Sequence, residues 1–150
     1  MGAEAETLNQ WTPAPALVAD PINHPTHYTA SPYEAITVIE SVGSGYCRGN
    51  ALKYLCRAPR KGTEAADLRK AAWYVRRLVT SREDFSVMGR TEAKAVATSW
   101  AGDGGVRHDA IRCLLTNRNY LGAGTDDFSA DALAAALEAE AERAAKGADK

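Results

Sequence analysis

Apolar residues recur along the chain at intervals of three and four positions, which is the spacing of one face of an α-helix. The first such stretch runs from Ala35 to Val42 and is followed by a Gly-Ser-Gly loop. Ser31 is placed to cap this helix, Pro32 suits its first position, and Glu34 completes an S-x-x-E capping box. The sequence therefore predicts a helix from this cap to Val42.

The next two apolar stretches predict helices over residues 50–57 and 64–81. Pro59 ends the first because a proline disfavours helical geometry in the residue before it. Glu64 lies where a carboxylate favours a helix start. The inward faces of the two helices comprise Ala51, Leu52, Leu55, Leu68, Ala71, Ala72, Val75, Leu78 and Val79.

Helical spacing returns over residues 91–100, 107–121 and 130–146, with the loop "AGDGG" between the first two. No stretch alternates with a period of two, so no strand is predicted and we expect an all-α fold. The chain is expected to comprise a flexible N-terminal arm, a compact helical core and an accessory helical region, at residues 1–20, 21–85 and 86–150.

Composition is typical of an intracellular globular protein. Hydrophobic residues make up 45% of the 150 residues, which is enough for a core. The three cysteines are too few for a disulfide framework and form no C-x-x-C pair, so neither such a framework nor a structural zinc site is expected. No apolar run approaches the ~18 residues of a membrane span, and no secretory signal is visible. A cytoplasmic protein is predicted.

Positive charge is concentrated in one part of this nearly neutral chain. Between Tyr46 and Arg82, ten Lys and Arg residues stand against two acidic residues, a net charge of +8, whereas the whole chain carries −1. Such segregation raises the local electrostatic potential and suits an anionic partner. A nucleotide, a nucleic acid and an acidic protein surface are all open at this point.

A stripe of polar and aromatic residues runs along the second predicted helix. Asn50, Lys53, Tyr54 and Arg57 lie at i, i+3, i+4 and i+7, so they share one helix face. Cations bind phosphate, aromatic rings stack, and amides hydrogen-bond to base edges. The mixture is typical of a nucleotide site, with a plain solvated face as the alternative.

A second stripe on the following helix comprises Asp67, Lys70, Tyr74 and Arg77. Asp67 is a candidate for holding a metal ion or orienting a base, and an ion pair with Lys70 is the structural alternative. Trp73 lies beside the stripe, and we expect both Trp73 and Tyr74 to be at least half buried.

Loops supply further candidates. The segment "NHPTHY" offers His24, His27 and Tyr28. Three roles are open for the two imidazoles: they orient a substrate or move a proton, they ligate a metal ion, or they form structural hydrogen bonds. The loop over residues 43–49 precedes a helix N-terminus, which favours an anion. No Walker A motif or G-x-G-x-x-G fingerprint occurs, so any phosphate chemistry proceeds without a P-loop.

Taken together, these motifs resemble a known family. Residues 21–82 are similar to a small bacteriophage domain family, mostly of undefined function and often described as nucleotide kinase. The remainder, 86–150, matches no part of the pattern. The resemblance rests on motifs in order, namely His24, Pro25, His27 and Tyr28, then Glu34, then Gly49, Asn50, Lys53, Tyr54, Arg57 and Lys61, then Asp67, Leu68, Lys70, Ala71, Trp73 and Tyr74.

The resemblance implies a nucleotide-binding protein acting on (deoxy)nucleoside monophosphates, because the best-understood member is a coliphage kinase without a P-loop. ATP and Mg²⁺ would then be the cofactors. The implied catalytic residues are His24, His27 and Asp67, the implied substrate-binding residues are Asn50, Lys53, Tyr54, Arg57, Lys61, Lys70 and Tyr74, and further candidates are Tyr28, Glu34 and Trp73.

Two other functions are open. One is a non-catalytic protein that sequesters a nucleotide-derived immune signal of the host, of cyclic or ADP-ribose type. The other is a nucleic-acid-binding protein, against which the acidic remainder of the chain argues. We also expect a homo-oligomer, because the short helices of residues 21–85 bury little surface alone.

Overall fold

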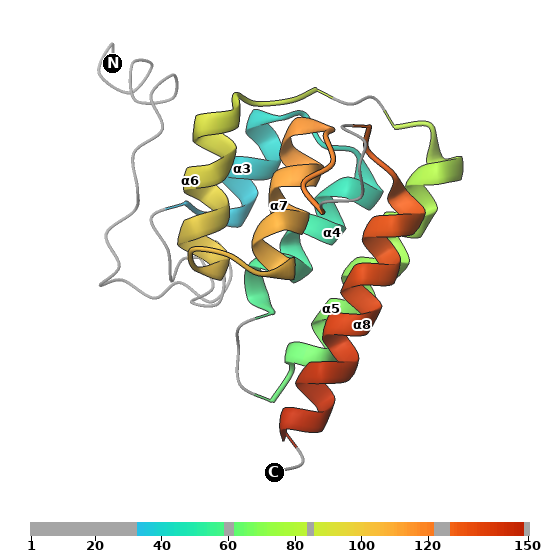
Figure 1. The fold of residues 1–150 in the computed structure, drawn as a ribbon. Coiled ribbons are helices and arrows are strands. Elements are labelled where there is room, and N and C mark those ends of the chain that lie inside the picture. Colours follow the sequence, from blue (N-terminus) through green and yellow to red (C-terminus); the bar gives the residue numbers. More distant parts are fainter. Residues whose placement is uncertain (1–32, 59–61, 84–85, 122–126, 149–150) are drawn as a thin grey trace.

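The computed structural model describes residues 33–58, 62–83, 86–121 and 127–148 of the chain. These ranges hold six α-helices and one isolated antiparallel bridge, between Arg118 and Asp127, so the all-α fold is confirmed (Figure 1). The predicted N-terminal arm and the "NHPTHY" motif lie outside the described residues. The helices are α3 (Ala35–Ser41), α4 (Tyr46–Arg57), α5 (Glu64–Ser81), α6 (Arg90–Ala101), α7 (Val106–Thr116) and α8 (Ala130–Ala148).

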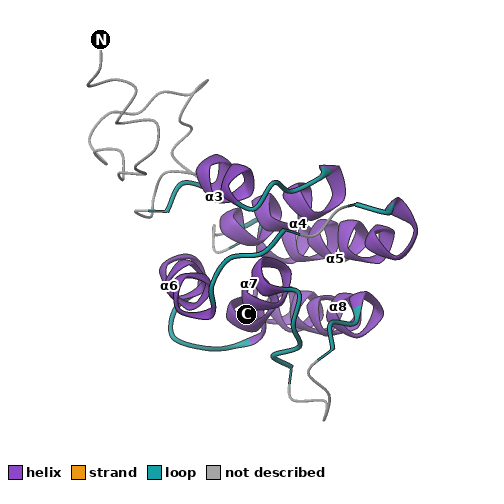
Figure 2. Ribbon diagram, turned by 90° about the horizontal axis from the view of Figure 1, so that it is seen from above, coloured by secondary structure: helices purple, strands orange, loops and turns teal. Residues whose placement is uncertain are grey.

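Helices from the two halves of the chain are interleaved in space. The long helices α5 and α8 lie side by side, and α5 also packs against α4 (Figures 1 and 2). Helix α6 pairs with α7, and α7 in turn contacts α4 and α8. Among the described residues, no helix is long and apolar enough to cross a membrane.

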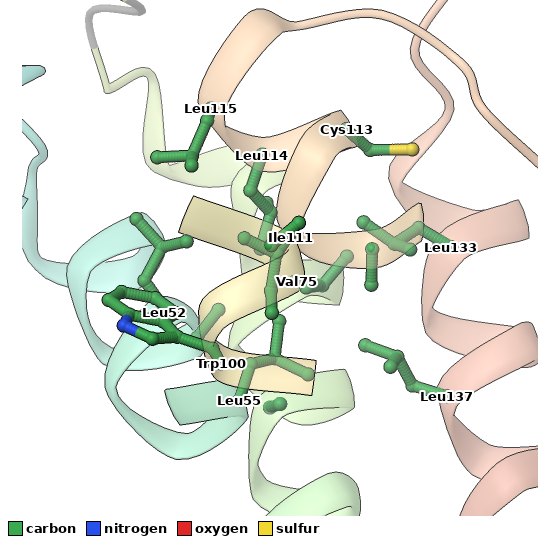
Figure 3. Close-up of a cluster of buried hydrophobic side chains, with 14 of the residues drawn as sticks. Leu52, Leu55, Val75, Trp100, Ile111, Cys113, Leu114, Leu115, Leu133 and Leu137 are labelled. Carbon is green, nitrogen blue, oxygen red and sulfur yellow. The ribbon is translucent and has the colours of Figure 1, made fainter. Parts of the chain in front are cut away.

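A single hydrophobic core joins all six helices. The side chains of Ala71 and Ala72 on α5, and of Ala134 on α8, are fully buried and small, so the two helix backbones approach closely. Because α6, α7 and α8 complete the core, α4 and α5 can leave one of their faces to solvent. The large core residues include Leu52, Leu55, Val75, Trp100, Ile111, Leu114, Leu133 and Leu137, labelled in Figure 3.

Two predicted helix starts differ from the structure. Helix α4 begins at Tyr46, four residues before the predicted start at Asn50, with Gly45 as its N-cap. In α3, Glu34 is itself the N-cap and makes no side-chain capping hydrogen bond there, so the helix starts later than predicted. The predicted capping box pairs Glu34 with Ser31 and stays a prediction. Ser31 and Pro32 lie outside the described residues.

Two helix ends also differ. Helix α7 ends at Thr116, short of the predicted residue 121, because Asn117 adopts the left-handed conformation (φ 55°). Helix α8 continues through Gly147, which was predicted to end it. The predicted helices over 64–81 and 91–100 and the loop between α6 and α7 are confirmed.

Candidate functional site

Four aromatic rings gather where α4 crosses α5. The rings of Tyr54 and Tyr74 stack with their centres 6.0 Å apart and their planes 14° from parallel. Tyr46 and Trp73 contact Tyr74 edge-on, at centre distances of 5.8 and 5.0 Å. Offset stacks and edge-on contacts are the favoured geometries of aromatic pairs. We call these four residues the aromatic cluster.

Three cations lie against this cluster. The ammonium groups of Lys53 and Lys70, from different helices, are 4.6 and 5.3 Å from the centre of the Tyr54 ring. The guanidinium carbon of Arg77 is 5.3 Å from the centre of the Trp73 ring. Within the described parts of the chain, no carboxylate forms an ion pair with any of the three. The aromatic cluster and these cations together are termed the α4–α5 face.

The rings differ in their exposure. Tyr54 and Tyr74 are partly buried, whereas Tyr46 is 70% and Trp73 56% exposed. The prediction that Trp73 is at least half buried is wrong, because the buried stripe of α5 passes through Ala72 and Val75 instead. A hydrogen bond with the Tyr46 hydroxyl, together with burial, raises the pKa of Tyr74 above its usual value.

An ion pair closes one end of the α4–α5 face. The Arg57 Nε atom lies 3.4 Å from the Asp67 Oδ2 atom, and Asp67 is 1% exposed against 29% for Arg57. The carboxylate therefore holds the arginine at the end of α4, and it does not form the alternative pair with Lys70. Asp67 is thus placed to orient a cation.

Arg48 belongs to the same basic stretch but is fully buried. Its guanidinium donates hydrogen bonds to the carbonyl oxygens of Val42, Ser86 and Leu114, at 2.7, 2.6 and 3.2 Å. Burial lowers the pKa of Arg48, and the charge of Glu83 opposes this shift. Arg48 thus joins the end of α3, the α5–α6 connection and α7, and it is not available to a ligand.

The anion expected at the start of α4 is supplied by the protein itself. The Glu83 carboxylate accepts hydrogen bonds from the backbone N–H groups of Cys47 and Arg48, at 2.7 and 3.1 Å. Burial alone would raise the pKa of Glu83, but these hydrogen bonds lower it on balance. A Cβ atom on Gly45 would lie 2.6 Å from Glu83, so only glycine leaves room for this carboxylate. The loop over residues 43–49 is therefore no open anion site.

Part of the remaining positive charge is neutralised by α8. Arg76 forms ion pairs with Asp131 and Glu138, which lie on the exposed side of that helix. The charge segregation seen along the sequence is thus partly cancelled in space. It leaves Lys53, Lys70 and Arg77 as the cations of the α4–α5 face.

Other predicted site residues fall elsewhere. The Asn50 amide nitrogen donates to the Tyr46 carbonyl oxygen at 2.8 Å, which keeps Asn50 beside the aromatic cluster. Glu34 is buried at the start of α3, next to Tyr33, whose carbonyl accepts a hydrogen bond from Trp100 of α6. The residues that lie outside the described ranges are His24, His27, Tyr28 and Lys61.

Tyr46 is the residue that sequence reasoning missed. It lies four residues before Asn50 on α4 and therefore continues the same helix face. The four-residue spacing between Tyr46 and Asn50 would have placed Tyr46 on this face, but the predicted helix started only at Asn50.

A separate hollow lies beside α6. An open cavity of about 490 Å³ is lined by Tyr33 and, from α6, by hydroxyl groups and Lys94. This cavity is lined by one cation and one aromatic ring, whereas the α4–α5 face has three cations and four aromatic rings. We therefore regard the α4–α5 face as the stronger candidate site.

Metal and thiol chemistry have little support in the described residues. No group of three or more His, Cys, Asp or Glu side chains is placed there to hold a metal ion. Burial raises the pKa of Cys56 to about 12 and that of Cys113 to about 11, so neither thiol is a nucleophile at neutral pH.

Comparison with known proteins extends these observations. Residues 22–76 match a family described as a protein of unknown function (DUF3310), and this range includes α3, α4 and most of α5. The Gene 1.7 protein of Enterobacteria phage T3 is 40% identical over 81 residues, which are 48% of this chain and 49% of that protein. The chain thus spans about half the length of the curated relative it matches. No solved structure matches.

The expected similarity to a bacteriophage domain is therefore confirmed for this part of the chain. Neither description mentions a nucleotide, so nucleotide kinase activity stays a prediction. The matched range includes Lys53, Tyr54, Lys70 and Tyr74 of the α4–α5 face.

Proposed function

We propose that the protein binds a nucleoside monophosphate on the α4–α5 face and acts as a nucleotide kinase-like enzyme. The observation that carries this proposal is the convergence of Lys53 and Lys70, from two helices, on the ring of Tyr54. Neither ammonium group is paired with a carboxylate in the described ranges, so both can bind an anion. Two cations beside an aromatic ring suit a phosphate next to a base.

The neighbouring side chains suit the rest of such a ligand. Arg57 is held in place by Asp67 and supplies a third cation at the end of α4. Asn50 uses one amide hydrogen on the Tyr46 carbonyl and keeps its amide oxygen for a base or sugar. Tyr54 and Tyr74 border the same region.

Phosphoryl transfer depends on neutralising charge and positioning groups in line, which these cations suit. ATP with Mg²⁺ would supply the phosphoryl group. His24, His27 and Lys61, outside the described residues, are the further candidates for positioning the acceptor. Phosphoryl transfer is proposed because residues 21–82 resemble the bacteriophage domain family that is often described as nucleotide kinase.

The test combines binding and turnover. Calorimetry with each deoxynucleoside monophosphate should show that Lys53→Met and Lys70→Met each weaken binding by about 10-fold or more, because a charge-assisted hydrogen bond is lost. Arg69→Met is the matched control, since Arg69 is an exposed cation next to Lys70 on another face of α5. Wild-type protein should phosphorylate at least one monophosphate in the presence of ATP and Mg²⁺.

Two results would contradict the proposal. One is the absence of binding by the wild-type protein. The other is an equal loss for Arg69→Met and Lys70→Met, which would indicate general electrostatic attraction and not a site.

Sequestration without turnover is the second candidate, and a specific observation favours it. Asp67 is the carboxylate that lies in the polar stripes of α4 and α5, and it is already paired with Arg57. No group of three or more His, Cys, Asp or Glu among the described side chains is placed to hold a metal ion. A metal-dependent reaction would therefore need ligands from outside these ranges. Ligand capture needs only the cations and the rings. The captured ligand would be a nucleotide-derived signal of cyclic or ADP-ribose type.

Denaturing the loaded protein separates the two candidates. The protein is incubated with ATP, Mg²⁺ and a monophosphate, then denatured, and the released small molecules are analysed by mass spectrometry. A diphosphate product supports the kinase, whereas tight binding with recovery of unchanged ligand supports sequestration.

A further inference from the structure

Part of the α4–α5 face, namely Tyr46, Trp73 and Arg77, is unused by the site described above. We propose that Tyr46, Trp73 and Arg77 form a second nucleotide subsite, so that the preferred ligand contains two nucleotides joined through phosphate. This inference rests on the proposed nucleotide binding at Lys53 and Lys70.

The α4–α5 face contains one arrangement of ring and cation twice. In one unit, Lys53 and Lys70 lie over the ring of Tyr54. In the other unit, Arg77 lies over the ring of Trp73. Tyr74 contacts both units, because it stacks on Tyr54 and meets Trp73 edge-on. Each unit thus pairs an aromatic ring with a cation, as one nucleotide requires.

The rings of the two units differ in their exposure to solvent. The ring of Tyr54 already contacts Tyr74 and the two lysine ammonium groups, so it is less open to a base than the rings of the other unit. Tyr46 and Trp73, in contrast, are among the most exposed large hydrophobic residues of the described chain, at 70% and 56%. Both touch Tyr74, so they lie on one patch. Open rings beside cations are the usual platform for stacking a base.

The cations of the two units are separated along α5. Lys70 and Arg77 are seven residues apart on α5, which corresponds to about 10 Å along the helix axis. Each lies over its own ring, so the two cations are placed to bind two different phosphates of one ligand. Neither has an ion-pair partner in the described ranges, which makes the charge of both units complementary to an anion.

The experiment compares the binding of a nucleoside monophosphate with that of a dinucleotide. The 5′-phosphorylated dinucleotide pdTpdT and dTMP, and the corresponding guanine compounds, are titrated by calorimetry. We expect the wild-type protein to bind one of the dinucleotides at least about 10-fold more tightly than its monophosphate. In Trp73→Leu and in Arg77→Gln, this ratio should fall to near one.

Fluorescence gives a second readout. Stacking on the exposed Trp73 ring should quench tryptophan emission with the dinucleotide, and Trp73→Leu should abolish that quench. Trp100 is buried and bonded to the Tyr33 carbonyl, so its emission should be unaffected. Because Trp73 and Arg77 are exposed, circular dichroism should show both variants folded.

The outcomes separate this inference from the proposed function. Equal affinity for monophosphate and dinucleotide would overturn the second subsite and leave the first intact, whereas absence of binding by either would overturn both. Affinity that keeps rising with (dT)4 and (dT)8 and falls steeply with salt would also overturn it, because that behaviour indicates a nucleic-acid surface.

Discussion

Arg48 and Lys53 lie five residues apart on α4, yet the fold uses their charges in opposite ways. Arg48 is fully buried and donates to three carbonyl oxygens from three separate segments. Lys53 lies over an aromatic ring, with no carboxylate paired to it in the described chain. This basic stretch therefore combines a cation whose acceptors the fold supplies with a cation that has no carboxylate partner among the described residues.

The same contrast holds for anions near α4. At the N-terminus of the helix, the Glu83 carboxylate occupies the place where a ligand anion was expected. On the side of the helix, the cations of the α4–α5 face are free to meet one. Substitutions that remove a structural group should change stability, and those that remove a group of the face should change binding only.

The largest effect is expected for Arg48→Met. Three buried carbonyl groups lose their donor, so the free energy of unfolding should fall by at least about 3 kcal/mol. Urea denaturation followed by circular dichroism measures this change. Arg48→Lys should rescue little, because an ammonium group cannot reproduce the planar fork of guanidinium donors. A loss below about 1 kcal/mol would show that the buried network contributes little.

Asp67→Asn should have the next largest effect. The change leaves Arg57 without its carboxylate in a partly buried position, and we expect a loss of about 1–3 kcal/mol in the same assay. Asp103→Asn, in the exposed loop between α6 and α7, is the control and should lie within about 0.5 kcal/mol of wild type.

Glu83→Gln should be destabilising in a pH-dependent manner. The folded state holds the pKa of Glu83 below its usual value, so its stabilisation is present above the unfolded pKa of about 4.3 and is lost as the pH falls through the lower folded value. The penalty of the substitution should be about 1–2 kcal/mol at pH 7 and should shrink below about pH 4. Urea denaturation midpoints of the wild type and the variant at pH 7 and below pH 4 measure this penalty. An equal penalty at both pH values would contradict the role of the Glu83 carboxylate at the start of α4.

Gly45→Ala should cost about 1 kcal/mol, because the new methyl group displaces the Glu83 carboxylate from the backbone N–H groups. Gly104→Ala meets no atom within 4 Å and should be nearly neutral. Combining Gly45→Ala with Glu83→Gln should cost less than the sum of the two, since both disrupt one contact.

The smallest effect on stability is expected for Lys53→Met, at most about 0.5 kcal/mol. The same variant is expected to lose nucleotide binding. Comparison with Arg48→Met in one set of denaturation curves therefore tests the contrast directly. A large destabilisation by Lys53→Met would show that this lysine, too, is structural.

Local spacing was sufficient to group the main side chains of the α4–α5 face by helix. Lys53 and Tyr54 were assigned to one helix face, and Lys70 and Tyr74 to another, and the structure places these four residues together. The spacing could not predict the partner of Asp67, because Arg57 lies on a different helix. It also misjudged Trp73, since the side of α5 that α8 covers depends on the tertiary packing.

The sequence by itself determined the helices and the order of side chains around each one, because helical periodicity depends on residues within a few positions of one another. Only the tertiary structure decided which cations bind acceptors within the protein and which have no carboxylate partner among the described residues. The acceptors of Arg48 lie between 6 and 66 residues away, and Glu83, which accepts from the Arg48 backbone N–H, lies 35 residues after Arg48. Such contacts exist only once the helices have packed, so no local pattern encodes them.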